Sequence, residues 1–293
     1  MKLEQLLARK ILLMDGAMGT ALIARGAKGA LEMLNVESAA QVEALHEEYL
    51  QAGADIITTN TICADALSLA EYGLQSRSYE LARAGAELAR RVADKYSTTE
   101  HPRLVAGSVG PTTRNLTLAN DTTAEQMAAV YADVIRGLKD GGVDIILIES
   151  VMDAANAKVA IEECRKIDAD IPIILSAVLS RIAGRVASGA TIAKFLEDLP
   201  MEQVAVVGFN CTNGPKPMTD AIKTLSAACD KPLAYPAAGQ PVVAANHFAK
   251  EMEQMCRAGL LNIVGGCCGT TPDYIAQLAK VTQRWRPRKV VKK

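Results

Sequence analysis

Three cysteines, each at the end of an apolar run, are the residues of this sequence best placed to do chemistry. Cys267 and Cys268 stand between glycines directly after the run Leu260–Val264, and Cys211 ends the run Val204–Asn210. Neighbouring side chains of a regular strand point to opposite faces, but flanking glycines allow backbone angles that turn both sulfurs toward one ion. Three thiolates leave one position of a tetrahedral Zn²⁺ open, which is typical of a catalytic zinc. The spacing therefore predicts a Zn²⁺ site formed by Cys211, Cys267 and Cys268.

The alternative interpretation is that these three cysteines only fill space, because buried cysteine behaves as a small hydrophobic residue. We assign that packing role to the other four, which have no partner at ligand spacing: Cys63, Cys164, Cys229 and Cys256. Seven scattered cysteines argue against a disulfide framework and for a reducing compartment.

Composition favours small-molecule chemistry. The chain has 293 residues, a net charge of -1 and 22% charged residues, so it lacks the basic surplus of a nucleic-acid-binding protein. It has no apolar run of the roughly 18 to 20 residues that would span a bilayer, and the first residues do not form a signal peptide. We therefore expect a cytoplasmic protein without nucleic-acid or membrane partners.

One pattern recurs eight times: an apolar run of strand length, a tip rich in Gly, Asn, Thr or Pro, and a segment of helical periodicity. The runs are Ile11–Met14, Ala54–Asn60, Leu104–Gly110, Val143–Ser150, Ile173–Leu179, Val204–Cys211, Pro232–Ala238 and Asn262–Cys268. The expected helices are Ala39–Ala52, Ser78–Tyr96, Ala124–Gly141, Ala154–Ile167, Ile192–Leu199, Pro217–Cys229, Ala244–Ala258 and Asp273–Arg284. Near-continuous apolar strands are typical of a parallel sheet that is buried on both faces.

Eight strand–helix pairs predict a closed (β/α)8 TIM barrel of the α/β class. An open doubly wound sheet is the alternative. We expect a single domain over residues 1–293, with a short, basic, solvated tail from about residue 285. Reactive residues of such barrels sit at the carboxyl ends of the strands. The polar residues that follow the apolar runs lie there: Asp15, Asn60, Glu149, Cys211, Cys267 and Cys268.

Three residues near the strand ends can bind substrate or shape the loops. Asp15 can bind an amine or stabilise its own turn, and Asn60 can orient substrate or satisfy loop backbone. The turn that begins at Gly16 can offer backbone N–H groups to a carboxylate, because small residues let the chain approach closely.

Six segments together resemble the homocysteine S-methyltransferase family, most closely the homocysteine-binding barrel of cobalamin-dependent methionine synthase. They are Asp15–Thr20, Thr59–Thr61, Gly107–Thr112, Ile148–Ser150, Gly208–Cys211 and Gly265–Thr270. The resemblance implies that a zinc on Cys211, Cys267 and Cys268 takes the thiol of homocysteine as its fourth ligand. It also implies that Glu149 receives the α-amino group of homocysteine. A thiolate is the reactive nucleophile and a free thiol is mostly protonated at neutral pH, so metal coordination explains the activation; no further catalytic residue is expected.

The sequence departs from the family's pattern after the seventh strand. Related proteins commonly have Pro-Asn-Ala-Gly or Pro-Asn-Ser-Gly there, whereas this chain has Pro236-Ala237-Ala238-Gly239. An amide beside the zinc site is replaced by a methyl group at Ala237.

The methyl donor is the least determined part of the interpretation. The likeness to methionine synthase favours methylcobalamin carried by a separate corrinoid-binding protein, with a methylfolate-binding module also in trans. A second hypothesis is a self-sufficient methyltransferase that uses S-methylmethionine or a betaine, although a cationic donor calls for aromatic faces and only 4% of residues are aromatic. A third is a non-catalytic zinc- or thiol-binding module of a larger complex.

Overall fold

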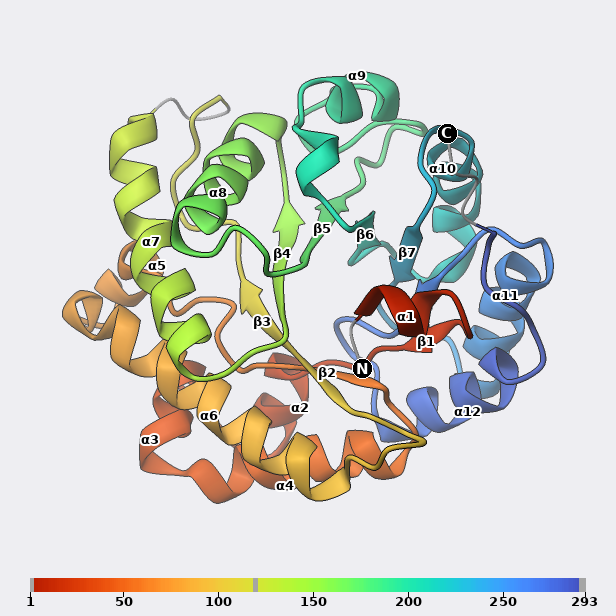
Figure 1. Ribbon diagram of the computed structural model, residues 1–293, viewed down its shortest axis with the longest axis horizontal. Helices are drawn as coiled ribbons and strands as arrows, with labels where there is room; N and C mark the ends of the chain where they lie inside the picture. The colour runs from red at the N-terminus through yellow and green to blue at the C-terminus, as the bar shows by residue number, and fades with distance from the viewer. Residues whose placement is uncertain (1–2, 118–120, 290–293) are drawn as a thin grey trace.

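Eight parallel strands form one sheet that curls into a barrel, with helices around the outside (Figure 1). The computed structural model describes residues 3–117 and 121–289. The strands are β1 (Leu12–Leu13), β2 (Ile56–Thr58), β3 (Leu104–Val109), β4 (Ile145–Val151), β5 (Ile173–Val178), β6 (Val206–Asn210), β7 (Pro232–Tyr235) and β8 (Ile263–Val264). All eight lie within or next to the predicted apolar runs.

The two ends of the sheet order meet, which closes the barrel. The order runs β1-β8-β7-β6-β5-β4-β3-β2, and every neighbouring pair is parallel. Between β1 and β2, Met14 forms a parallel bridge with Ile56, whose carbonyl also accepts from the Asp15 N–H at 3.0 Å. The Asp55 N–H donates to Leu13 O at 2.7 Å. The fold is therefore the predicted TIM barrel and not an open doubly wound sheet.

All eight predicted helices are present, with ends shifted by at most two residues. They are α4 (Ala39–Gln51), α6 (Ser78–Tyr96), α7 (Ala124–Asp140), α8 (Ala154–Ile167), α9 (Ile192–Glu197), α10 (Pro215–Ala228), α11 (Ala245–Arg257) and α12 (Pro272–Thr282). Short helices were not predicted: α1 (Leu3–Leu7), α2 (Gly19–Ala24), α3 (Leu34–Glu37), α5 (Ala66–Ala70), and the 3-10 turns η1 (Leu31–Met33), η2 (Gln75–Arg77) and η3 (Met201–Gln203). Segments of three to six residues are too short to show a helical period.

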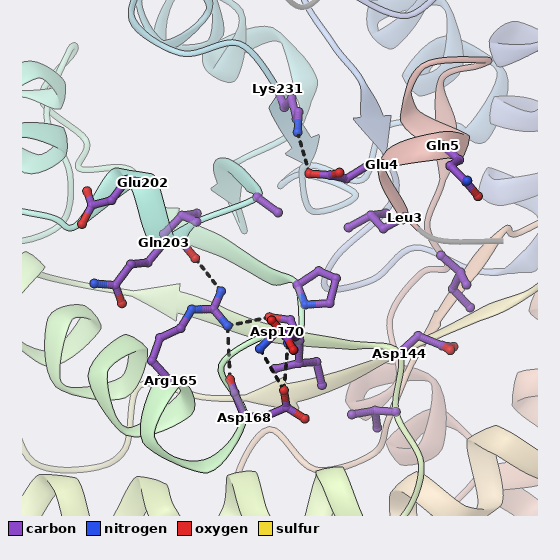
Figure 2. A pocket seen from close by; sticks show the side chains of 16 residues that line it. Leu3, Glu4, Gln5, Asp144, Arg165, Asp168, Asp170, Glu202, Gln203 and Lys231 are labelled. Atoms are coloured by element: carbon purple, nitrogen blue, oxygen red, sulfur yellow. Dashed lines mark hydrogen bonds and ion pairs between the residues drawn. The ribbon is translucent and has the colours of Figure 1, made fainter.

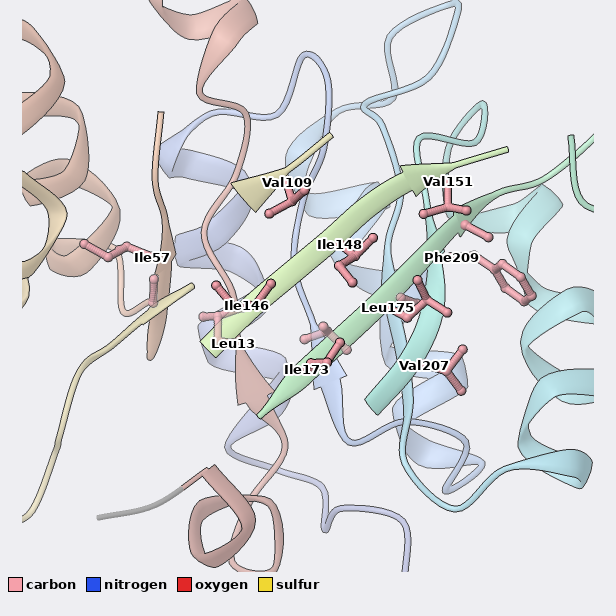
Figure 3. Close-up of a cluster of buried hydrophobic side chains, with 14 of the residues drawn as sticks. Leu13, Ile57, Val109, Ile146, Ile148, Val151, Ile173, Leu175, Val207 and Phe209 are labelled. Carbon is pink, nitrogen blue, oxygen red and sulfur yellow. The ribbon is translucent and has the colours of Figure 1, made fainter. Parts of the chain in front are cut away.

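Alternation along the strands divides the core into two parts. In β4, Ile146 and Ile148 face the surrounding helices, together with outward residues of other strands such as Leu175 and Phe209 (Figure 3). Leu147, between these two, faces the barrel axis and packs with inward residues of other strands such as Ile174 and Leu233. Burial on both faces explains why the strands read as nearly unbroken apolar runs.

Helix α1 closes the amino-terminal end of the barrel (Figure 1). Leu3, Leu6 and Leu7 are at most 4% exposed and belong to the same cluster as the inward side chains of the strands. The first helix therefore covers the apolar interior of the barrel at the amino-terminal ends of the strands.

The segment after α12 packs against the body of the protein. Trp285 contacts the outer core, and the backbone N–H of Arg288 donates to Leu261 O at 3.2 Å. Asn262 Nδ2 donates to Arg288 O at 3.0 Å. The segment from Trp285 to Arg288 is therefore anchored to the body and does not form the solvated tail expected from residue 285. Lys289 is exposed, and residues 290–293 lie outside the described part of the chain. Within the described part, no helix is long and apolar enough to cross a membrane.

Candidate metal centre and substrate cavity

The inward side chains change from apolar to polar at the carboxyl ends of the strands. Residues two positions beyond the apolar layer keep the inward direction because side chains alternate along a strand. They form a polar layer over the apolar one: Thr58, Ser108, Glu149, Ser176, Asn210 and Tyr235. Because side chains alternate along each strand, the polar side chains of six strands lie together in one layer above the apolar core.

A cavity of about 760 Å³ lies above this layer. Its wall includes Glu149, Tyr235, Cys267 and Cys268, together with the loops that follow β1 and β2. The volume is in the range of small-molecule sites.

A second cavity, of about 1040 Å³, lies at the opposite end of the barrel (Figure 2). Its two most central basic groups are already bound within the protein. Arg165 Nη1 and Nη2 each donate to backbone carbonyls, those of Ile171 and Gln203, at 2.7 Å, and Lys231 lies 3.6 Å from Glu4. The reactive residues named by the sequence are all absent from its lining, so the candidate site is the smaller cavity at the carboxyl ends.

The three predicted cysteine ligands converge at that cavity. Cys211 Sγ lies 2.7 Å from Cys267 Sγ and 3.3 Å from Cys268 Sγ, and the third pair is 4.0 Å apart. In a tetrahedral zinc site with Zn–S bonds of 2.3 Å, the sulfurs are separated by roughly 3.8 Å. The all-sulfur donor set suits zinc, and the 4.0 Å pair matches this separation, whereas the pairs at 2.7 and 3.3 Å would have to open to admit the ion. Of the other four cysteines, Cys164, Cys229 and Cys256 are absent from the cavity lining. Cys63 is exposed and lines the cavity, so the predicted packing role is wrong for that residue.

Backbone geometry at the strand ends makes this convergence possible. Cys211 has φ of +53°, a left-handed angle that is uncommon outside glycine and that turns its sulfur toward the pair. Gly265 and Gly266 serve close packing instead: a Cβ on Gly265 would lie 2.8 Å from Met14 Cβ, and one on Gly266 would clash with Thr270. These two glycines are thus needed for contact, whereas left-handed angles occur at Cys211 and at Gly269, which follows the cysteine pair with φ of +79°.

The turn after β7 braces both cysteine loops through its backbone. The Cys267 N–H donates to Pro236 O at 2.9 Å, and the Ala238 N–H donates to Cys268 O at 2.8 Å. The Ala237 N–H donates to Thr212 O at 3.3 Å, next to Cys211. Main-chain bonds therefore hold the sulfur cluster in place where the family's amide is replaced by the methyl group of Ala237.

Glu149 is buried at the base of the cavity, 7% exposed, and is held by two hydroxyl groups. Ser108 Oγ donates to one carboxylate oxygen at 2.6 Å and Tyr235 Oη donates to the other at 3.2 Å. Burial raises the pKa of Glu149, and the two hydrogen bonds oppose that rise. Sequence reasoning assigned no role to Ser108 or Tyr235, although their inward register with Glu149 would have identified them.

Asp15 stabilises the end of β1 and also lines the cavity. Thr58 donates to it through its N–H at 2.7 Å and its hydroxyl at 2.6 Å, so the carboxylate ties the β1 end to β2. It also lines the cavity, and burial, with a smaller contribution from the charge of Glu149, raises the pKa of Asp15 to about 7. Gly16 lies beside it in the cavity wall, where a Cβ would lie 2.9 Å from the Tyr49 ring.

Asn60 lines the cavity, but its amide nitrogen is engaged by the protein. Asn60 Nδ2 donates to Leu31 O at 2.8 Å and to Asn35 Oδ1 at 3.0 Å. These bonds attach the 3-10 turn η1 to the end of β2, which supports the loop-stabilising role for this residue.

The sequence profile described as homocysteine S-methyltransferase matches residues 12–282. A crystal structure of the homocysteine methyltransferase MmuM from Escherichia coli, in its metallated form, has a TM-score of 0.82 and 27% identity. That match covers 95% of this chain and 98% of the MmuM chain. The oxidised form of MmuM has a TM-score of 0.78 and 26% identity, over 92% and 95% of the two chains.

More distant structures share the barrel alone. A chitinase catalytic domain from Pyrococcus furiosus has 10% identity and a TM-score of 0.58, with 94% of this chain and 96% of that one covered. This likeness shows the fold and carries no information on chemistry.

Proposed function

The chain belongs to the homocysteine S-methyltransferase family, and from that premise we propose that it methylates the thiol of homocysteine to give methionine. The observation that carries the proposal is the convergence of three cysteine sulfurs, at 2.7 to 4.0 Å from one another, at a cavity that also contains buried carboxylates. Such a cavity can hold a small amino acid by its charged end while its thiol lies at the sulfur cluster.

Cys211, Cys267 and Cys268 would hold a zinc ion, which when bound supplies a site where a thiol loses its proton at neutral pH. Cys267 and Cys268 line the cavity and Cys211 contacts both from behind. The homocysteine sulfur attacks the donor's methyl carbon with a lone pair; the bond between that carbon and the donor heteroatom breaks, and its electrons stay with the donor. A cationic donor leaves as a neutral molecule, and the thiol proton goes to solvent.

The amino-acid end of homocysteine would be bound by Glu149, with Asp15 nearby. Both carboxylates are buried, and burial raises the pKa of each because the charged form lacks solvent. A substrate ammonium group would favour the anionic form of both carboxylates and form charge-assisted hydrogen bonds with them. Tyr235 and Ser108 orient the Glu149 carboxylate and leave it facing the cavity.

We propose a small cationic methyl donor, S-methylmethionine or a betaine, in preference to methylcobalamin on a partner protein. An E. coli chain of nearly the same extent carries the name homocysteine methyltransferase, which favours a self-sufficient reaction. The cavity of about 760 Å³ also has small-ligand dimensions, and a whole corrinoid would not fit inside it. Tyr72 and Tyr235 line the cavity, so two aromatic side chains are near a cationic donor despite the low aromatic content of the chain.

The test is single-turnover transfer from methyl-labelled donors to homocysteine by the zinc-loaded protein, followed by mass spectrometry of methionine. We expect labelled methionine from S-methylmethionine or glycine betaine, and none with Cys268→Ala. Transfer from methylcobalamin alone would overturn the donor assignment and restore the corrinoid partner and methylfolate module. Bound zinc without transfer to any thiol would favour the non-catalytic module. The free thiols of the site also keep the cytoplasm as the expected compartment.

A further inference from the structure

The cavity extends beyond the sulfur cluster into a part formed by the loops after β1 and β2. Residues of this part include Glu32 in η1, Cys63 after β2, and Glu71 and Tyr72 after α5. Homocysteine bound between the cysteines and Glu149 would leave this part free. We call it the outer pocket, defined by Glu32, Cys63, Glu71 and Tyr72.

We propose that the outer pocket binds the cationic methyl donor and that Glu32 is the residue that recognises the donor's positive charge. This inference rests on the proposed function and extends it to the donor-binding residue. Glu32 is 4% exposed although it lines the cavity, and the N–H of Cys63 donates to its Oε1 at 3.0 Å. The carboxylate is thus fixed on one side by backbone and faces the cavity without a basic partner among the described residues.

Charge in the cavity wall favours a cation. Four carboxylates line the cavity, those of Asp15, Glu32, Glu71 and Glu149, against one basic residue, Lys28. Lys28 is exposed, and the described structure contains no ion pair between it and Glu32. A wall with this balance concentrates small cations in a cavity of low dielectric constant.

A bound cation would stabilise the charged form of the buried Glu32 carboxylate. Burial raises the pKa of Glu32, and the nearby charge of Asp65 raises it further, whereas the bond from the Cys63 N–H lowers it. A buried anion without a counter-charge is costly, so a ligand that brings a positive charge gains more here than at a solvated carboxylate.

Two other features suit a sulfonium or quaternary ammonium donor. Tyr72 lines the same part of the wall, and an aromatic side chain beside the pocket suits a cationic ligand. The position of Glu32 is also fixed independently of the donor, because Asn60 holds the carbonyl of its neighbour Leu31 at 2.8 Å. The proposal gives Asn60 a positioning role: it holds η1 in place and does not contact homocysteine.

The test compares Glu32→Gln with Glu37→Gln. The glutamine at position 32 keeps an acceptor for the Cys63 N–H and removes the charge, while Glu37 is exposed on α3 and lies outside the cavity lining. Calorimetry measures binding of S-methylmethionine, of glycine betaine and of homocysteine, and steady-state kinetics gives KM for each donor.

We expect Glu32→Gln to weaken donor binding roughly 10- to 100-fold, as for loss of a charge-assisted contact. Homocysteine affinity and zinc content should stay unchanged, and Glu37→Gln should behave as wild type. If S-methylmethionine alone is affected, the ligand at Glu32 is an amino-acid sulfonium; if betaine alone is affected, it is a quaternary ammonium. An unchanged KM for the donor that wild type uses would overturn the role of Glu32. Wild-type protein that uses neither donor would instead contradict the proposed function.

Discussion

The side-chain amide nitrogen of Asn210 lies 3.8 Å from the sulfur of Cys267. The amide oxygen of the same residue accepts hydrogen bonds from Ser176 Oγ at 2.8 Å and from the Ser150 N–H at 3.2 Å. Ser150 has φ of +59°, directly after Glu149, where the register of β4 shifts. One buried side chain therefore joins the sulfur cluster to the strand that carries Glu149.

Replacing Asn210 with aspartate should weaken zinc binding. The new carboxylate can still accept from Ser176 and from the Ser150 N–H, but it loses the amide hydrogens directed at Cys267 Sγ and at Ser150 Oγ. It also places a second negative charge beside a thiolate. Changes of groups that support metal ligands typically lower metal affinity 10- to 100-fold, measurable by competition with a chelator. The thiolate-to-metal absorption bands of the cobalt-substituted protein should also shift. Asn213→Asp is the control, because Asn213 contacts Gln240 and no sulfur; equal affinities would contradict a role for Asn210.

Loss of any one of the three clustered cysteines should abolish both metal and thiol binding. We expect the zinc content of Cys267→Ala, Cys268→Ala and Cys211→Ala to fall from about one ion per chain to near zero, because two thiolates do not complete the site. Homocysteine affinity, measured by calorimetry, should fall with it. Cys229→Ala serves as the control, since Cys229 packs near the outer core. Undiminished homocysteine binding by Cys267→Ala would refute the site assignment.

Removing the charge of Glu149 should abolish recognition of the substrate's amino group. We expect Glu149→Gln to weaken homocysteine binding roughly 10- to 100-fold, while 4-mercaptobutanoate, which lacks the amine, should bind both proteins alike. Tyr235→Phe, which removes one of the two hydroxyl groups on this carboxylate, should have a smaller effect. Glu162→Gln, exposed on α8, is the control. A parallel loss for both thiols would indicate a structural role for Glu149.

Much of this arrangement could be predicted from sequence because the barrel couples strand position to function. Apolar runs buried on both faces identified all eight strands, and the residues after them fell at one end of the barrel. That rule alone predicted that Cys211, Cys267 and Cys268 lie together. The positions of their sulfurs also depend on a left-handed backbone angle at Cys211, which the sequence does not indicate.

Other features depend on pairings between distant segments. The sequence does not indicate that the Asn60 amide donates to Leu31 O, or that the Arg288 N–H donates to Leu261 O just before β8. The role of Glu32 was missed for the same reason: its segment is a three-residue turn without periodicity, and only the fold shows that it lines the cavity. Inward register, by contrast, could have identified Ser108 and Tyr235 in advance.

His46 gives the protein a stability that depends on pH independently of the active site. The imidazole lies in α4, is 0% exposed, and neither ring nitrogen has a hydrogen-bond partner within the described structure. Burial lowers the pKa of His46 to about 4, from an ordinary value of 6.5. The unfolded chain therefore binds a proton between these values while the folded chain does not, so stability falls as pH drops from about 6.5 toward 4.

His46→Leu should remove this dependence, because leucine has no group to protonate and fits an apolar site. When the pH is lowered from 7.5 to 5, protonation of this histidine in the unfolded state should lower the unfolding free energy of wild type by about 2 kcal/mol. The variant should not show this loss. The burial that raises the pKa of Asp15 to about 7 acts in the opposite direction over an overlapping range, so the wild-type curve alone would mask the effect. The quantity to measure is the difference between variant and wild type in urea denaturation at the two pH values. An equal difference at both pH values for His46→Leu would mean that the imidazole does not titrate on unfolding.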